Sequence, residues 1–208
     1  MNIHDFGDQV AENGPYTIRD LFAARKTSFL GFCEVEKDQG GIDLSVNISM
    51  PDGQRNARDL YARTVEELLE AFDSHEPAHM REELIDSLNF ATGIIYLGGI
   101  SESTEAHLIS ELESIFSVDQ VIYKGSSYLT KSDIGQGANS FSSFLEKLRN
   151  RTWQHSVQHP YFMGEKELVK SLVKFWLFIA MHFQNYEEFS HYFMAKDAVL
   201  KFRLETKY

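Results

Sequence analysis

The chain has 208 residues, the size of one large or two small domains, and its hydrophobic fraction of 43% with sixteen Phe and nine Tyr excludes a disordered chain. The formal net charge is −11 and is unevenly distributed. Residues 1–132 carry a net charge of −13, whereas residues 133–208 carry eight acids and ten bases. The acidic part is unsuited to binding a polyanion, and the last third tolerates phosphate.

A β-hairpin is predicted over residues 28–50. Between Ile42 and Ser49 apolar and polar residues alternate, which is the period of a half-buried strand. Gly40 and Gly41 lie where the hairpin loop is expected, and a Pro-Asp-Gly turn follows the second strand.

Helices are predicted over residues 57–72, from Pro77 onward, and from Ser103 onward, because apolar residues recur there with helical spacing. In the first of these helices the glutamates lie opposite the apolar face. We interpret them, with those of the next helix, as an acidic solvated surface that could attract a basic partner; they are Glu66, Glu67, Glu70, Glu82 and Glu83.

Residues 132–140 contain two glycines and an asparagine and are predicted to be a linker. A helical stripe of apolar residues follows over residues 141–148, and a long apolar helix is predicted from Glu165. The fold class expected from these elements is α+β and mostly α. An acidic region with the hairpin and helices would span residues 1–132, and a helical region would span residues 133–208.

The candidate functional motif lies between the last two helices. Arg149 and Asn150 follow the helical stripe, and His155 comes five residues after Asn150. A guanidinium forms charge-assisted bonds to phosphate oxygens, and an imidazole titrates near neutral pH, so the pair can grip a phosphate and move a proton. This chemistry suits RNA cleavage by the ribose 2′-hydroxyl, which needs no metal.

The motif and its helices resemble the HEPN superfamily, whose signature is an Arg, four to six residues and a His, often with a polar residue directly after the Arg. The resemblance covers residues 133–208 and implies a HEPN-like helical bundle. It further implies a metal-independent endoribonuclease of a toxin or antiviral defence system, acting as a homodimer on RNA. His155 would then be the general acid or base, Arg149 would stabilise the phosphate, and Asn150 would position one of them. Neither a metal nor a cofactor is expected.

Two alternatives stay open. Arg149 and Arg151 can simply be cations that favour the negative end of a helix. The chain can also be a non-catalytic acidic binding protein, such as an immunity protein, an inhibitor or an antitoxin-like module, whose partner is a basic protein or cognate regulator. A further pattern, H-E-x-x-H at His75 to His79, requires both histidines on one continuous helix, and Pro77 interrupts that helix.

The sequence predicts a cytoplasmic protein without a membrane partner. The longest apolar stretch, residues 172–183, is shorter than the roughly 20 residues that span a bilayer. The first thirteen residues carry three acids and no base, unlike a secretory signal. Cys33 is the single cysteine, which excludes an intramolecular disulfide and a multi-cysteine zinc site.

Overall fold

The computed structural model describes residues 10, 13–36, 41–117, 121–125, 128–148 and 162–206. Within these ranges all regular secondary structure is helical. The elements in chain order are α2 (Ile18–Glu36), α3 (Pro51–Asp73), α4 (Pro77–Gly93), the 3-10 helix η2 (Ile94–Tyr96), α5 (Glu102–Ser117), α6 (Lys131–Asn139), α7 (Ser142–Leu145), α8 (Glu165–Ala180) and α9 (Tyr186–Thr206).

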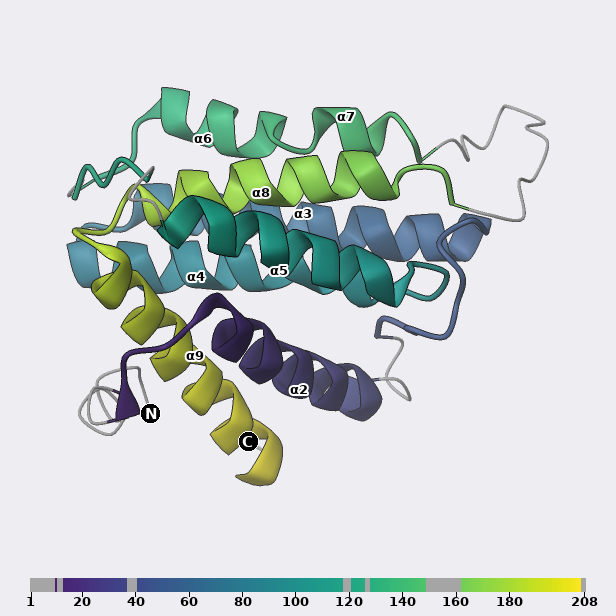
Figure 1. Ribbon diagram of the computed structural model, residues 1–208, viewed down its shortest axis with the longest axis horizontal. Helices are drawn as coiled ribbons and strands as arrows, with labels where there is room; N and C mark the ends of the chain where they lie inside the picture. The colour runs from purple at the N-terminus through teal and green to yellow at the C-terminus, as the bar shows by residue number, and fades with distance from the viewer. Residues whose placement is uncertain are drawn as a thin grey trace.

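Helix α8 is the centre of the bundle. It packs against α4, α5, α6 and α7, while α9 packs against α2 and α4. Figure 1 shows α6 and α7 along the top, α3 and α4 running side by side behind α8 and α5, and α2 and α9 below them. The apolar stripes of these helices therefore face one another across a shared interior.

The aromatic part of this interior is built around Trp176. Its ring stacks on Phe22 of α2 at 5.1 Å between centroids and meets Phe189 of α9 edge-on at 5.8 Å. The indole N–H donates to the hydroxyl of Thr92 at 3.1 Å, so the polar atom of this buried ring has a partner. Rings of α2 and α9 thus pack against Trp176 of α8.

Helices α3 and α4 form the most extensive helix pair of the structure. Each begins with a proline, Pro51 and Pro77, which suits the first helical position because the missing amide hydrogen has no partner there anyway. The short turn between Asp73 and Pro77 makes the two helices antiparallel neighbours (Figure 1). The helices predicted over residues 57–72 and from Pro77 are confirmed, and this pair positions the site described below.

The predicted hairpin over residues 28–50 is wrong, and with it the α+β fold class. Residues 28–36 are the second half of α2, and the described part of the segment before α3 contains turns rather than a strand. Its backbone bonds to the loop after η2: the Ile48 amide donates to the Gly98 carbonyl at 2.7 Å, and the Gly98 amide to the Leu44 carbonyl at 2.8 Å. Of the alternating apolar residues Ile48 is completely buried, while Ile42 and Leu44 pack partly buried against the core.

The segment predicted as a linker is helix α6. Thr130 caps it by accepting from the Asp133 amide, while the Asp133 carboxylate accepts from the Thr130 amide at 2.7 Å. Gly137 is buried, and a side chain there would meet the Phe178 ring, so this glycine permits close helix packing. None of the helices in the described part of the chain has the length and apolar character that crossing a bilayer requires.

Candidate functional site

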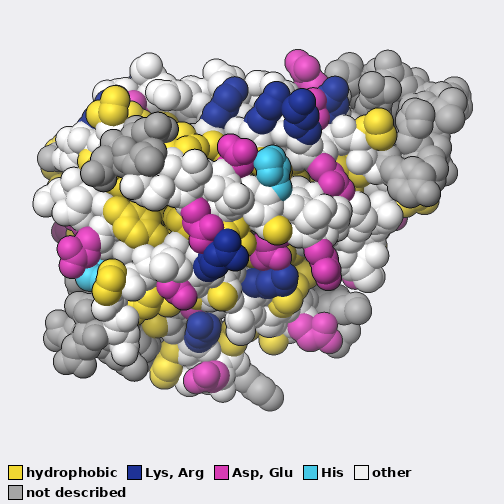
Figure 2. All heavy atoms as spheres, in the orientation of Figure 1, with side chains coloured by type: hydrophobic (Ala, Val, Ile, Leu, Met, Phe, Trp, Pro, Cys, Tyr) yellow, Lys and Arg dark blue, Asp and Glu magenta, His cyan; other side chains and the backbone are white. Residues whose placement is uncertain are grey.

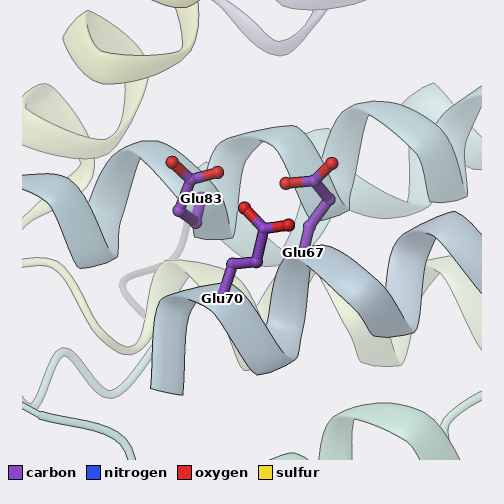
Figure 3. Close-up of side chains that lie close together, drawn as sticks. All are labelled: Glu67, Glu70 and Glu83. Atoms are coloured by element: carbon purple, nitrogen blue, oxygen red, sulfur yellow. The ribbon is translucent and has the colours of Figure 1, made fainter. Parts of the chain in front are cut away.

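Carboxylates from α3 and α4 converge in the groove between the two helices. Glu67 and Glu70 lie three residues apart on α3 and therefore share a face, and Glu83 approaches them from α4. One oxygen of each lies within 4.8 Å of the others, and Figure 3 shows the three side chains pointing toward one another. Asp86 follows Glu83 by three residues on α4 and interacts electrostatically with Glu67. We call these four residues the carboxylate cluster.

The carboxylates of the cluster differ in burial, and their charges act on one another. Glu83 is buried, Glu67 is half-buried and Glu70 is exposed. Burial, a hydrogen bond with Glu83 and the charges of Asp86, Glu83 and Glu70 raise the pKa of Glu67 to about 8. The folded state therefore favours the protonated form of Glu67, and a cation that offset the neighbouring charges would favour its ionised form.

Two basic groups adjoin the cluster. Lys196 of α9 approaches Asp86 with its ammonium 2.7 Å from Oδ2, and Nδ1 of His79 lies 3.1 Å from Glu83 Oε1. Burial raises the pKa of Asp86 although Lys196 opposes the shift. Burial lowers the pKa of Lys196, but the charge and hydrogen bond of Asp86 outweigh it and raise the pKa overall. The pair is therefore a buried ion pair whose two charges depend on each other.

A pocket of about 200 Å³ adjoins the carboxylate cluster, because two members of the cluster, Glu67 and Asp86, are also part of the pocket wall. Helices α2, α3, α4 and α9 surround it. Most of its other walls are aromatic or aliphatic, from Phe29, Phe32, Cys33, Ile42, Leu60, Phe90 and Leu200. Three arginines also line it: Arg25, Arg63 and Arg203. We call it the Asn89 pocket, after the residue discussed next.

Asn89 carries an unpartnered amide into this pocket. The residue is 4% exposed, and within the described residues neither its side-chain nitrogen nor its side-chain oxygen has a hydrogen-bond partner. Its backbone carbonyl is held by Arg25, which donates from Nε at 3.1 Å and from a terminal nitrogen at 2.9 Å. Burial lowers the pKa of Arg25 to about 10. A buried donor and acceptor without partners among the described residues are open to a ligand or to an ordered water.

The carboxylate cluster has the ligand set of a hard divalent cation. Mg²⁺ and Mn²⁺ prefer carboxylate oxygens, and helix-borne carboxylates that face each other are a recurrent way to hold metals in helical bundles. Glu67, Glu70 and Glu83 offer one oxygen each within a common radius, and the charge of Asp86 acts on Glu67 from α4. The H-E-x-x-H pattern does not contribute such a site, because His75 precedes α4 and only His79 lies on it.

The sequence-predicted site residues, Arg149, Asn150 and His155, lie outside the described residues. On one side Leu148 is buried and its carbonyl accepts from Arg58 of α3 at 2.7 Å. On the other side α8 begins at Glu165. The motif therefore stays a prediction.

Sequence reasoning assigned the glutamates of α3 and α4 to a solvated face and missed the cluster. The signal was present as E-x-x-E on one helix and E-x-x-D on the next, with Asn89 three residues after Asp86. Each spacing puts two carboxylates on one helix face, and the short turn makes those faces neighbours. Compared with known proteins, the chain matches no family model, no curated protein and no solved structure.

Proposed function

We propose that this chain hydrolyses nucleoside triphosphates in a divalent-cation-dependent reaction that releases pyrophosphate. The observation that carries the proposal is the wall shared by the carboxylate cluster and the Asn89 pocket. This shared wall supports a substrate whose organic part lies buried in the Asn89 pocket and whose anionic part is bound by a cation in the carboxylate cluster.

The carboxylate cluster supports the phosphate end of this substrate. Carboxylates alone repel a phosphate, whereas Mg²⁺ bound by one or two carboxylates commonly completes its coordination with phosphate oxygens. Such a cation neutralises the charge that develops during transfer of a phosphoryl group and polarises the bond that breaks. The exposed Glu70 places the cluster within reach of solvent, and a cluster carboxylate can accept the proton of the attacking water.

The Asn89 pocket supports the organic end. A cavity of about 150 Å³ accommodates benzene, so 200 Å³ leaves room for the ring of a nucleobase. The rings of Phe29 and Phe90 offer apolar contact, and the Asn89 amide presents a donor beside an acceptor, as the polar edge of a base does. Arg63 and Arg203 bring cations for the phosphate oxygens.

The expected cleavage point follows from proximity. Because Glu67 and Asp86 line the pocket itself, we expect the phosphate nearest the sugar to reach the cluster when the base lies in the pocket. Water would therefore attack that phosphorus, the bond to the next phosphate would break, and the products would be a nucleoside monophosphate and pyrophosphate.

A panel of nucleoside triphosphates incubated with Mg²⁺ or Mn²⁺ tests the proposal, with products separated by anion exchange. We expect pyrophosphate release that EDTA abolishes and that Glu83→Gln removes. Glu66→Gln is the matched control, since it makes the same change at an exposed residue of α3 outside the cluster. Absence of cation-dependent hydrolysis across the panel, with the protein folded, would overturn the proposal.

A second candidate function is the one expected from the sequence: a metal-independent endoribonuclease that uses Arg149, Asn150 and His155. It is favoured by the helices that flank the motif and by the exposed lysines of α8, which are Lys166, Lys170 and Lys174. They recur every four residues and so lie on one stripe of the helix. Figure 2 shows Lys and Arg side chains gathered along the upper part of the face it displays.

Cleavage of single-stranded RNA in EDTA separates the two candidates. The ribonuclease hypothesis requires RNA cleavage without a metal that His155→Ala abolishes and His159→Ala preserves. The nucleotide-hydrolase proposal requires that both variants keep cation-dependent pyrophosphate release. RNA cleavage that survives loss of His155 would rule out the ribonuclease site.

A further inference from the structure

We propose that Lys196 of α9 restrains the cation affinity of the carboxylate cluster by pairing with Asp86. This inference rests on the proposed function, because it concerns how the same cluster holds its cation. Lys196 would act as a positioning residue that competes with the cation for the Asp86 carboxylate.

The geometry supports competition for a single carboxylate. The Lys196 ammonium lies 2.7 Å from Asp86 Oδ2, and both side chains are largely shielded from solvent, at 10% and 21% exposed. Asp86 lies three residues after Glu83 on the same face of α4, and its charge acts on Glu67 of α3. Its carboxylate is therefore the member of the cluster that a basic side chain already engages from another helix.

The surroundings make the ion pair sensitive to charge. The groups that act on Lys196 are Asp86, Glu83 and Glu82 of α4, and those that act on Asp86 also include Arg25 of α2. A divalent cation among the glutamates would repel the nearby ammonium and attract Asp86 at the same time. Because the pair is poorly solvated, these interactions are weakly screened.

The pocket beside the cluster supplies the independent sign that a ligand belongs here. Asn89, one helical turn beyond Asp86 on α4, has a buried amide without a partner in the described residues, and it lines the pocket to which Asp86 also contributes. Lys196 of α9 would thus pair with Asp86 when the cation leaves and release Asp86 when the cation binds.

Titration calorimetry of the full chain with MnCl₂ tests the inference without relying on activity. Removal of the ammonium in Lys196→Met should raise Mn²⁺ affinity about tenfold, since one nearby positive charge is lost and Asp86 becomes available. Lys196→Arg keeps the charge and should bind Mn²⁺ like the wild type. In Lys196→Met/Asp86→Asn the gain in affinity should disappear.

Asp86→Asn alone gives a second route in case Lys196→Met folds poorly. It leaves Lys196 uncompensated beside the glutamates, so Mn²⁺ affinity should fall. Lys201→Met is the matched control, because Lys201 pairs at 2.7 Å with Asp197 of α9 and not with the cluster. If the wild type binds Mn²⁺ and both Lys196→Met and Asp86→Asn bind it with unchanged affinity, the inference about Lys196 is overturned. The proposed function is not affected by that result. Failure of the wild type to bind Mn²⁺ would overturn both.

Discussion

Two buried regions of the bundle differ in how they treat polar groups. Around Trp176 the rings of α2, α8 and α9 pack face to face and edge to face, and the indole N–H bonds to Thr92. In the Asn89 pocket an amide is buried without a partner among the residues that the structure describes, and next to it Glu67 lies among other carboxylates. Burial of unsatisfied polar groups and like charges costs stability, so the first region supports the fold, whereas in the second the proposed ligand and cation would offset that cost.

The largest expected effect on stability comes from the aromatic region. Trp176→Ala should lower the free energy of unfolding by about 3–5 kcal/mol, because it leaves a cavity among packed rings. Urea unfolding followed by circular dichroism measures this loss. Trp176→Phe is the control, since it keeps much of the ring contact and should cost less. A loss below about 1 kcal/mol for the alanine variant would contradict the role assigned to this core.

A substitution in the carboxylate cluster should lower activity without lowering stability, in contrast to Trp176→Ala. Glu83→Gln should reduce cation-dependent hydrolysis at least about a hundredfold. Mutation of a residue that merely supports a metal ligand already lowers activity by up to about a hundredfold, and Glu83 is proposed as a ligand itself. Without a cation its melting temperature should be no lower than that of the wild type, because one of several repelling charges is gone. Loss of hydrolysis together with a lower melting temperature would mean that Glu83 supports the fold instead.

Asn89→Leu should weaken nucleotide binding and at the same time raise the stability of the fold. A leucine of similar size removes the unpartnered amide, so the free energy of unfolding should rise by about 1 kcal/mol. The KM for the preferred nucleotide should increase and its preference over other bases should decline. Leu88→Ala, a deletion at a fully buried position on the same helix, is the control that should lower stability. A destabilised Asn89→Leu variant would contradict the assignment of Asn89 to a ligand.

The smallest expected effect is a difference in pH dependence. The pKa of Glu67 is raised to about 8, so the folded state holds its proton more tightly than the unfolded chain, and this contribution to stability is lost as pH rises toward 8. Burial lowers the pKa of His182 to about 4, so its contribution is present above pH 6.5 and is lost as pH falls toward 4.

Only Glu67 of these two titrates between pH 6.5 and 8, so that window isolates the cluster. Urea unfolding without a divalent cation should show stability declining across it, and Glu67→Gln should reduce the decline. Between pH 6.5 and 4 the unfolding free energy of the wild type is compared with that of His182→Phe. The variant should lose less stability on acidification, because it has no buried imidazole to protonate. An unchanged slope in Glu67→Gln would show that the cluster does not titrate in this range.

Helical periodicity predicted α3, α4 and the long helix α8 because each has an apolar stripe that the bundle buries. The alternation around Ile48 imitated a strand, since a turn-rich segment can also place every second side chain inward, and its partner, the Gly98 loop, lies about fifty residues away in sequence. The Asn89 pocket could not be predicted from the sequence, because it forms only where α9 packs beside α2, α3 and α4, about a hundred residues or more earlier in the chain. The carboxylate spacing was readable but resembles an ordinary solvated face.

Calorimetric titration of the wild-type chain with Mn²⁺ measures whether the carboxylate cluster binds a divalent cation. We expect one Mn²⁺ per chain, with binding lost in Glu83→Gln and kept in Glu66→Gln. Absence of binding to the folded wild type, or binding that persists unchanged when Glu67, Glu70 and Glu83 are each replaced by glutamine, would contradict this expectation.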